Sequence, residues 1–337
     1  MTGKHIGPGK RLKLELFAKL QDRRIEEHRL RQLFWECTLR CNAACLHCGS
    51  DCRVQSELKD MPVEDFCRAL DSVARQYVPH KVMVNITGGE PLVRRGCVEL
   101  CRMIAQVPGI REIDLTTNGI LLPRYAHALK DAGVTRVNIS IDSLDSEKYA
   151  RITGGGSLSD ALGGIRAAAE AGLTPIKLNT VLIGGFNDGE IPDFVELTRD
   201  APLELRFIEL MPMGGRFGPE AYLPGDTVLE RVPSLEPLAE NGGVARLYRL
   251  PGGLGRVGLI SPLSRHFCRT CNRLRLTSEG SLKPCLHSGQ EIPVRGQHGQ
   301  ELIDTLRRAI FAKPRMHGTL DAAHPSEAGR SMNTIGG

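Results

Sequence analysis

The stretch LFWECTLRCNAACLHC, residues 33–48, joins an apolar run to a loop that carries three cysteines. The run Leu33–Glu36 has the length and apolar character of a buried strand. Cys41, Cys45 and Cys48 follow it, separated by three and then two residues. Clustered cysteines of this kind often converge on a metal centre. The stretch therefore predicts a strand that ends in a metal-binding loop.

Short apolar runs alternate with helical patterns from this strand to about residue 210. Such alternation predicts βαβ units and a parallel sheet, and six units with right-handed crossovers would curl into a partial barrel. We predict an α/β fold, a partial (β/α)6 TIM-like barrel, with its chemistry on the loops after the strands. The expected strands are Leu33–Glu36, Lys81–Thr87, Glu112–Thr116, Arg136–Ile141, Ile176–Val181 and Glu204–Leu210, and the expected helices are Pro62–Tyr77, Val98–Val107, Pro123–Ala132, Leu158–Ala171 and Gly189–Arg199.

The pattern changes at both ends of this region. Residues 10–31 have the spacing of an amphipathic helix. After about residue 215, glycine, proline and charged residues become frequent, and the elements become short. We predict three parts: an N-terminal helical extension over 1–32, the barrel over 33–214, and a C-terminal region over 215–337 that carries a metal site of its own.

The composition narrows the range of partners. The chain has 337 residues, with a formal net charge of +5. This mild excess suits an anionic small molecule and lacks the concentrated basic stripe of a nucleic-acid binder. No run of residues is apolar and long enough for a signal peptide or a membrane span, so we expect a soluble cytoplasmic protein. Its eleven cysteines would stay reduced there and favour metal binding over disulfides.

The spacing of the first cysteine set leaves the metal open. Iron–sulfur clusters usually have four cysteine ligands, so a three-cysteine loop would leave one iron free for a small molecule. Zinc is the alternative, because His47 or Cys52 could complete a four-ligand set.

This loop resembles the signature of radical S-adenosylmethionine (SAM) enzymes, as does TGGEP at residues 87–91. The resemblance implies an open iron chelated by the amino and carboxylate groups of SAM. The glycines would let the backbone approach that ligand, and Glu90 would accept from its ammonium group. The resemblance assigns to SAM binding Gly88, Gly89, Glu90, Thr116, Ser140, Asn179 and Met211.

A second cysteine set lies near the C-terminus, where Cys268, Cys271 and Cys285 are separated by two and thirteen residues. A zinc ribbon completed by His266 or His287 is one interpretation; a cluster with an open iron is the other. The segment NRLRLT, residues 272–277, alternates apolar and basic residues. As a strand it would project Arg273 and Arg275 to one side, where guanidinium groups could hold phosphate or carboxylate.

This C-terminal site resembles that of the GTP 3′,8-cyclase family of molybdenum cofactor biosynthesis, as do RFIELMP at 206–212 and the terminal GG. The resemblance implies a C-terminal iron–sulfur-binding region, two 4Fe–4S clusters and SAM. It implies a lyase reaction in which a 5′-deoxyadenosyl radical takes hydrogen from C3′ of GTP, the C3′ radical attacks C8, and 3′,8-cyclo-7,8-dihydro-GTP results. It also implies an electron donor such as flavodoxin and a downstream pathway enzyme, and leaves a homodimer open. The implied substrate residues are Lys177, Arg206, Arg273, Arg275, Gly336 and Gly337, with Arg273 and Arg275 catalytic.

Three positions depart from the family pattern. Phe34, Met83 and Asn85 stand where the family usually has basic residues that handle the anionic substrate. Each lost charge-assisted hydrogen bond would cost about 1.5–3 kcal/mol. The segments FWECTLR and CGSDC also look more like radical enzymes that modify peptides. A related two-cluster radical SAM enzyme acting on a peptide or another small molecule is therefore the alternative. An electron carrier or a zinc protein would not need TGGEP.

Overall fold

The computed structural model of the chain describes residues 32–48, 60–76, 82–213, 217–239, 243–318, 320 and 326. The helix expected over 10–31 and the terminal Gly336 and Gly337 lie outside these residues.

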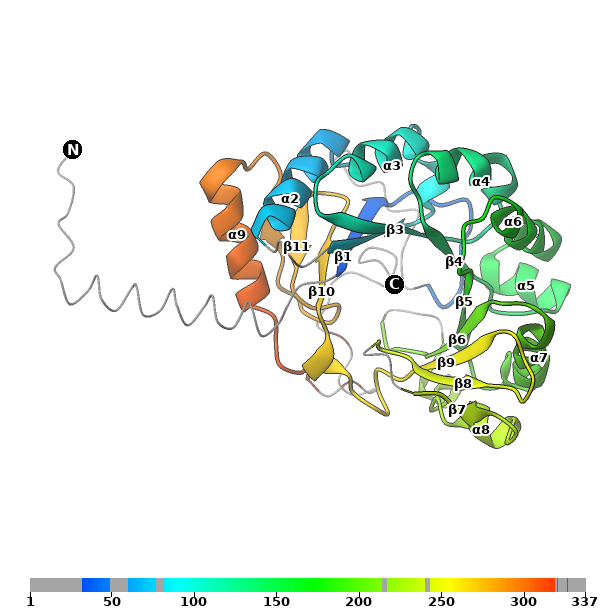
Figure 1. Cartoon of the computed structure of the whole chain (residues 1–337). Helices are drawn as coiled ribbons and strands as arrows, with labels where there is room; N and C mark the ends of the chain where they lie inside the picture. The colour runs from blue at the N-terminus through cyan, green and yellow to red at the C-terminus, as the bar shows by residue number, and fades with distance from the viewer. Residues whose placement is uncertain are drawn as a thin grey trace, which may run out of the picture.

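Six parallel strands, β1 to β6, form a curved sheet whose outer side is covered by helices (Figure 1). This arrangement confirms the predicted partial barrel. The strands are β1 (Gln32–Thr38), β2 (Val82–Gly88), β3 (Ile110–Thr117), β4 (Arg136–Ser140), β5 (Lys177–Leu182) and β6 (Glu204–Glu209), and the helices are α2 (Val63–Gln76), α3 (Cys97–Ala105), α4 (Leu122–Asp131), α5 (Ser146–Thr153), α6 (Leu158–Glu170) and α7 (Ile191–Asp200).

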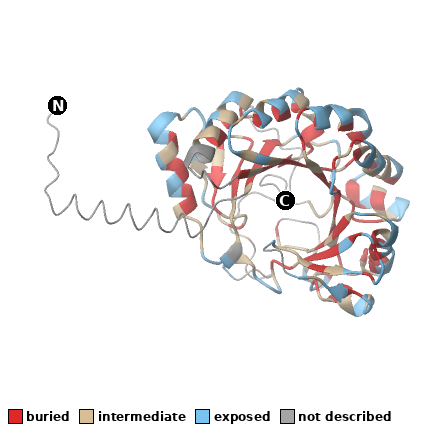
Figure 2. Ribbon diagram, in the orientation of Figure 1, coloured by how far each residue is buried: buried red, intermediate tan, exposed pale blue. Residues whose placement is uncertain are grey.

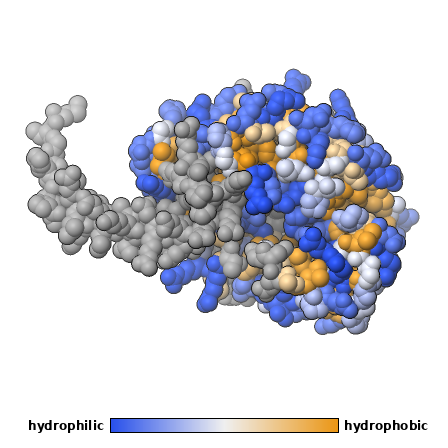
Figure 3. All heavy atoms as spheres, viewed as in Figure 1, coloured by the Kyte–Doolittle hydropathy of each residue, from blue (hydrophilic) through white to orange (hydrophobic). Residues whose placement is uncertain are grey.

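The strands form because most of their residues are buried on both faces, as parallel strands under helices require. Figure 2 shows buried residues along the sheet and on the helix faces that meet it. In β1, Trp35 is completely buried and stacks on Phe66 of α2, with ring centroids 3.8 Å apart. On the viewed face, hydrophilic side chains dominate the outer rim, while hydrophobic ones show nearer the middle (Figure 3).

The expected elements are present, with ends displaced by a few residues, but helix α5 was not predicted. Two local signals define it. Asp145 caps its first turn by accepting from the Lys148 N–H at 2.8 Å, and Gly154 ends it in the left-handed conformation. The helix has only eight residues, of which Tyr149, Ile152 and Thr153 are buried, and so short a segment cannot be assigned as a helix from periodicity alone.

The C-terminal region continues the same sheet beyond both edges of the barrel. Strand β9 (Arg256–Ile260) pairs in parallel with β6, and β10 (Arg273–Leu276) pairs in parallel with β1, placing Arg275 beside Phe34. The remaining elements are α8 (Thr227–Arg231), β7 (Glu236–Pro237), β8 (Arg246–Arg249), β11 (Ser281–Lys283), β12 (Ile292–Pro293) and α9 (Gly299–Phe311), with short 3-10 turns at Pro91–Val93, Asp188–Glu190, Pro219–Ala221 and Cys268–Thr270. Because β1 and β10 lie far apart in the sequence, the sequence pattern does not predict that they pair.

Among the described residues, no helix is both long and apolar enough to cross a membrane.

Candidate active site

The first cysteine loop lies over the carboxyl ends of the strands. Cys41, Cys45 and Cys48 line one cavity of about 160 Å³. Backbone hydrogen bonds tie the loop to the end of α5, from Ala44 N to Thr153 O at 2.9 Å and from Leu46 N to Ile152 O at 2.8 Å. The unpredicted helix therefore positions the cysteines.

The strand-end residues expected at this site converge on it. Gly88, Gly89, Thr116, Ser140, Asn179 and Met211 all line the cavity. The sequence did not single out the contact between His47 Nε2 and Asp142 Oδ2, 3.3 Å apart, although His47 lies inside the cysteine loop. This pair fixes the loop to the end of β4.

The two glycines of TGGEP allow the backbone to pack against the cysteine loop. A Cβ atom at Gly88 would lie 2.3 Å from the Thr38 carbonyl oxygen, and one at Gly89 would lie 2.3 Å from that of Arg40. Gly88 also has φ +138°, a conformation that disfavours side chains. Only glycine fits both positions without displacing the segment that leads into Cys41.

Glu90 lies beneath the cavity wall and not in its lining. Its carboxylate is fully buried and accepts hydrogen bonds from Leu92 N at 3.0 Å, Thr117 Oγ1 at 2.9 Å and Asn118 N at 2.8 Å. Burial raises the pKa of Glu90, and these hydrogen bonds oppose the rise. In this structure Glu90 holds the turn after β3, whose Thr117 and Asn118 line the cavity.

The second cysteine set lines an adjoining cavity of about 150 Å³. Cys268, Cys271 and Cys285 are joined there by Arg206, Arg273 and Arg275. The two cavities share four lining residues, Thr116, Asn179, Ile208 and Met211. The two cysteine sets therefore line adjoining cavities that share part of their walls.

Aromatic rings hold the guanidinium groups of the second cavity. The Phe34 ring lies 5.3 Å from the guanidinium carbon of Arg273 and 5.0 Å from that of Arg275, and Phe267 lies 5.8 Å from that of Arg273. Burial, and then the neighbouring charge of Arg275, lowers the pKa of Arg273 to about 10. The site thus keeps charged guanidinium groups buried, which costs desolvation free energy.

The other predicted cations lie deeper. Arg206 lines the cavity but is ion-paired with Glu204 at 2.5 Å. Lys177 is buried and is not among the lining residues; burial, followed by the charges of Arg206 and Arg136, lowers its pKa to about 8. Glu204 and Asp114 oppose this shift.

The structure also shows where the three residues that depart from the family pattern lie. Phe34 and Asn85 line the second cavity, and Asn85 Oδ1 accepts from Thr116 Oγ1 at 2.9 Å. The Met83 sulfur accepts from Arg136 at 3.2 Å.

Lys313 is a residue of the site that the sequence pattern did not predict. Lys313 lines the second cavity and donates to the carbonyls of Arg273 at 2.9 Å and Pro284 at 3.0 Å, which ties together the segments of Cys271 and Cys285. Burial would raise the pKa of the Cys271 thiol, but Lys313, the backbone N–H of Arg273 and the guanidiniums together lower it. Lys313 therefore favours the thiolate that binds metal.

Both donor sets fit the cofactors that the resemblance implies. Each set offers three thiols, the ligand type of iron–sulfur clusters, and leaves one iron open. In the first cavity the Asn179 Oδ1 atom is buried and has no hydrogen-bond partner among the described residues, so a ligand with N–H or O–H groups would satisfy it. The SAM amino, carboxylate and ribose groups meet that requirement.

Comparisons with known proteins agree with this geometry. Residues 35–198 match the radical SAM superfamily, and residues 203–319 match the Molybdenum Cofactor Synthesis C family. Streptococcus suis SuiB has a similar fold, with a TM-score of 0.57 and 14% identity over 92% of this chain and 73% of that chain. AnSMEcpe with bound AdoMet has a TM-score of 0.58 and 17% identity, covering 83% and 82%. The fold and the cysteine loop define a radical SAM enzyme.

Curated relatives show which family of radical SAM enzymes the chain resembles. The GTP 3′,8-cyclase of Alkaliphilus oremlandii is 53% identical over 75% of this chain and 81% of that protein. The GTP 3′,8-cyclase of Peptoclostridium acidaminophilum is 47% identical over 89% and 93%. The chain belongs to the GTP 3′,8-cyclase family, and its cofactors are SAM and two 4Fe–4S clusters.

Proposed function

We propose that this chain converts GTP to 3′,8-cyclo-7,8-dihydro-GTP in molybdenum cofactor biosynthesis, a lyase reaction. The observation that carries the proposal is the pair of adjoining cavities, which share the wall residues Thr116, Asn179, Ile208 and Met211. A radical formed beside the first cysteine set would meet a substrate beside the second without crossing solvent.

In the first half of the cavity, Cys41, Cys45 and Cys48 hold the N-terminal cluster. Its open iron and SAM supply, when bound, the 5′-deoxyadenosyl radical. Gly88 and Gly89 let the β2 backbone approach SAM closely, and Thr116, Ser140, Asn179 and Met211 orient it through contacts with the cavity wall. Glu90 acts through the turn after β3, which it holds by hydrogen bonds.

In the second half, Cys268, Cys271 and Cys285 would hold the C-terminal cluster, which would offer an open iron position to the guanine ring. Arg206, Arg273 and Arg275 line this half and bind the triphosphate through charge-assisted hydrogen bonds. Lys177 adds charge from behind the wall. Gly336 and Gly337, which the family resemblance assigns to the substrate site, lie outside the described residues.

The proposal includes an electron donor such as flavodoxin, because radical formation consumes an electron, and a downstream enzyme that takes the product. A cytoplasmic location fits the reduced thiols that cluster assembly needs. A homodimer is compatible with this account and is not required by it.

The test is an anaerobic assay of reconstituted protein with SAM, a strong reductant and GTP, followed by mass spectrometry. We expect 5′-deoxyadenosine and the cyclised product from the wild type and neither from Cys45→Ala. If SAM is cleaved but GTP neither stimulates the cleavage nor is consumed, the substrate assignment is overturned. The assignment of radical SAM chemistry would still hold.

A second candidate function rests on the uncharged residues of the substrate half. Phe34 and Asn85 line that half where the family pattern has cations. A substrate with fewer negative charges, such as a peptide or another small molecule, would suit such a wall. Unchanged GTP in the assay above would favour this second candidate.

A further inference from the structure

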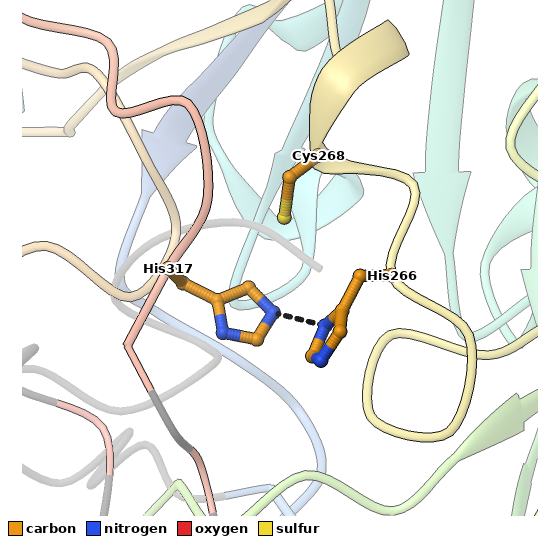
Figure 4. Close-up of side chains that lie close together, drawn as sticks. All are labelled: His266, Cys268 and His317. Atoms are coloured by element: carbon orange, nitrogen blue, oxygen red, sulfur yellow. Dashed lines mark hydrogen bonds between the residues drawn. The ribbon is translucent and has the colours of Figure 1, made fainter.

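Three side chains beside the second cysteine set form a compact group of metal-ligand type. His266 and Cys268 lie on the segment between β9 and β10, and His317 lies beyond α9 (Figure 4). Their ligand atoms all lie within 4.8 Å of one another. The backbone N–H of His317 also donates to the Cys268 thiol, so the segment beyond α9 is docked on this cysteine.

The spacing of the two imidazoles matches ligands of a single ion. His266 Nδ1 lies 3.2 Å from His317 Nε2, and two nitrogens bound at about 2.1 Å to one tetrahedral ion lie roughly 3.4 Å apart. A sulfur and a nitrogen on that ion would lie roughly 3.6 Å apart. Since the sulfur lies within 4.8 Å of both nitrogens, each sulfur–nitrogen separation need shorten by no more than roughly 1.2 Å.

The tautomer of His317 suits this role. Its Nδ1 lies 2.7 Å from the Gly318 carbonyl oxygen and would donate its proton there, which leaves Nε2 with a lone pair directed toward His266. Metal-ligating histidines are commonly oriented by such a hydrogen bond from the other ring nitrogen. The competing contact of Nε2, to the Pro262 carbonyl, is longer at 3.3 Å.

The donor chemistry selects the metal class. One thiolate and two imidazoles suit zinc and the divalent ions of the first transition series. Three protein ligands leave an open position, which distinguishes this group from the closed four-ligand sites of structural zinc. His266 is exposed, so an ion could enter from solvent.

We propose that His266, Cys268 and His317 bind one divalent transition-metal ion, zinc or iron, whenever the C-terminal cluster is not assembled. The inference rests on the proposed function in one respect, since Cys268 is assigned there to the cluster. One thiolate cannot serve both occupants in these positions. Zinc at this group therefore blocks assembly of the C-terminal cluster, and the two histidines determine how strongly it does so.

The experiment uses the full chain with Cys41, Cys45 and Cys48 replaced by alanine, so that only the C-terminal thiols of the two sets remain. The protein is reconstituted with iron and sulfide, with or without prior addition of one equivalent of zinc. Iron, sulfide and zinc are counted per chain. Without zinc we expect about four irons, one cubane. With zinc we expect about one zinc and little iron.

His266→Ala and His317→Ala, each made in that background, should keep their iron when zinc is added, because two ligands hold the ion weakly. His298→Ala is the matched control, since His298 is an exposed histidine at the start of α9, and it should behave as the background does. His266 is exposed, so its replacement leaves the packing intact.

Two results would overturn the inference: zinc that fails to bind the background protein, or zinc that excludes iron equally from both histidine variants. A different failure, no iron without zinc, would contradict the cluster assignment of the proposed function. Zinc binding that depends on His266 and His317 would still support the ion site in that case.

Discussion

The two halves of the cavity differ in what forms their walls. The SAM half is built mainly from backbone groups and short polar side chains at strand ends, held at Gly88, Gly89 and Glu90 by close packing and internal hydrogen bonds. The substrate half is lined by long cations, which aromatic rings and backbone carbonyls hold in place. SAM, which all radical SAM enzymes share, thus binds against a wall fixed by the backbone. The substrate, which differs between these enzymes, binds against side chains that can be substituted.

The largest expected effect separates the two cysteine sets. Cys45→Ala should abolish both SAM cleavage and product formation, because it removes a ligand of the cluster that cleaves SAM. Cys271→Ala should abolish product but leave SAM cleavage measurable, because Cys271 lines only the substrate half. Both products are quantified by liquid chromatography and mass spectrometry. Equal loss of SAM cleavage in the two variants would contradict the division of the cavity.

A smaller change tests the backbone wall of the SAM half. Gly89→Ala would place a methyl group 2.3 Å from the Arg40 carbonyl oxygen, and such overpacking costs about 1–3 kcal/mol. We expect a lower free energy of unfolding in urea and weaker SAM binding by calorimetry. Gly189→Ala is the control, since nothing lies within 4 Å of its added Cβ. If both variants bind SAM as the wild type does, the tight approach is not needed.

Phe34 tests the side-chain wall of the substrate half. Phe34→Leu removes two cation–π contacts, each worth about 0.5–2 kcal/mol. Without these contacts the guanidinium groups of Arg273 and Arg275 are held less firmly for substrate binding. We therefore expect KM for GTP to rise by about tenfold, equivalent to about 1.4 kcal/mol, with a smaller change in kcat. Phe34→Tyr keeps an aromatic face and should restore most of the affinity. A KM unchanged in Phe34→Leu would mean that the arginines are held by other contacts.

The smallest expected effect is a pH dependence in the same half. Burial and nearby cations lower the pKa of Lys177 from 10.5 to about 8, so the folded protein binds this proton less tightly than the unfolded chain. The unfavourable contribution of the charged lysine is complete below about pH 8 and disappears as pH rises toward 10.5, so this group makes stability increase across that window.

Binding of an anionic substrate should change in the opposite direction. Lys177 loses its charge as pH rises through about 8, and KM for GTP should then increase. Lys177→Met should start with a higher KM and lack this rise. Initial-rate measurements between pH 7 and 9, a range that brackets this pKa, check the prediction. A parallel rise in both proteins would assign the titration to another group.

The same contrast explains how much could be predicted from sequence. Cys41 to Cys48 and residues 87–91 are contiguous motifs at the ends of strands, and the resemblance that they carry placed Thr116, Ser140, Asn179 and Met211 in the cavity that they line, although Glu90 lies behind its wall. The C-terminal site depends on contacts across the whole chain. Strand β10 pairs with β1, and Lys313 joins the segments of Cys271 and Cys285. No periodicity signals such long-range contacts. Helix α5 was missed because its eight residues are too few for a helical pattern to be distinctive.

The most direct test of this account, in which the adjoining cavities bring SAM and GTP together, uses GTP labelled with deuterium at C3′. In the reconstituted enzyme with SAM and reductant, we predict that deuterium appears in 5′-deoxyadenosine, because the radical formed in the first half reaches the substrate in the second. Formation of unlabelled 5′-deoxyadenosine, with GTP recovered fully deuterated, would contradict the account.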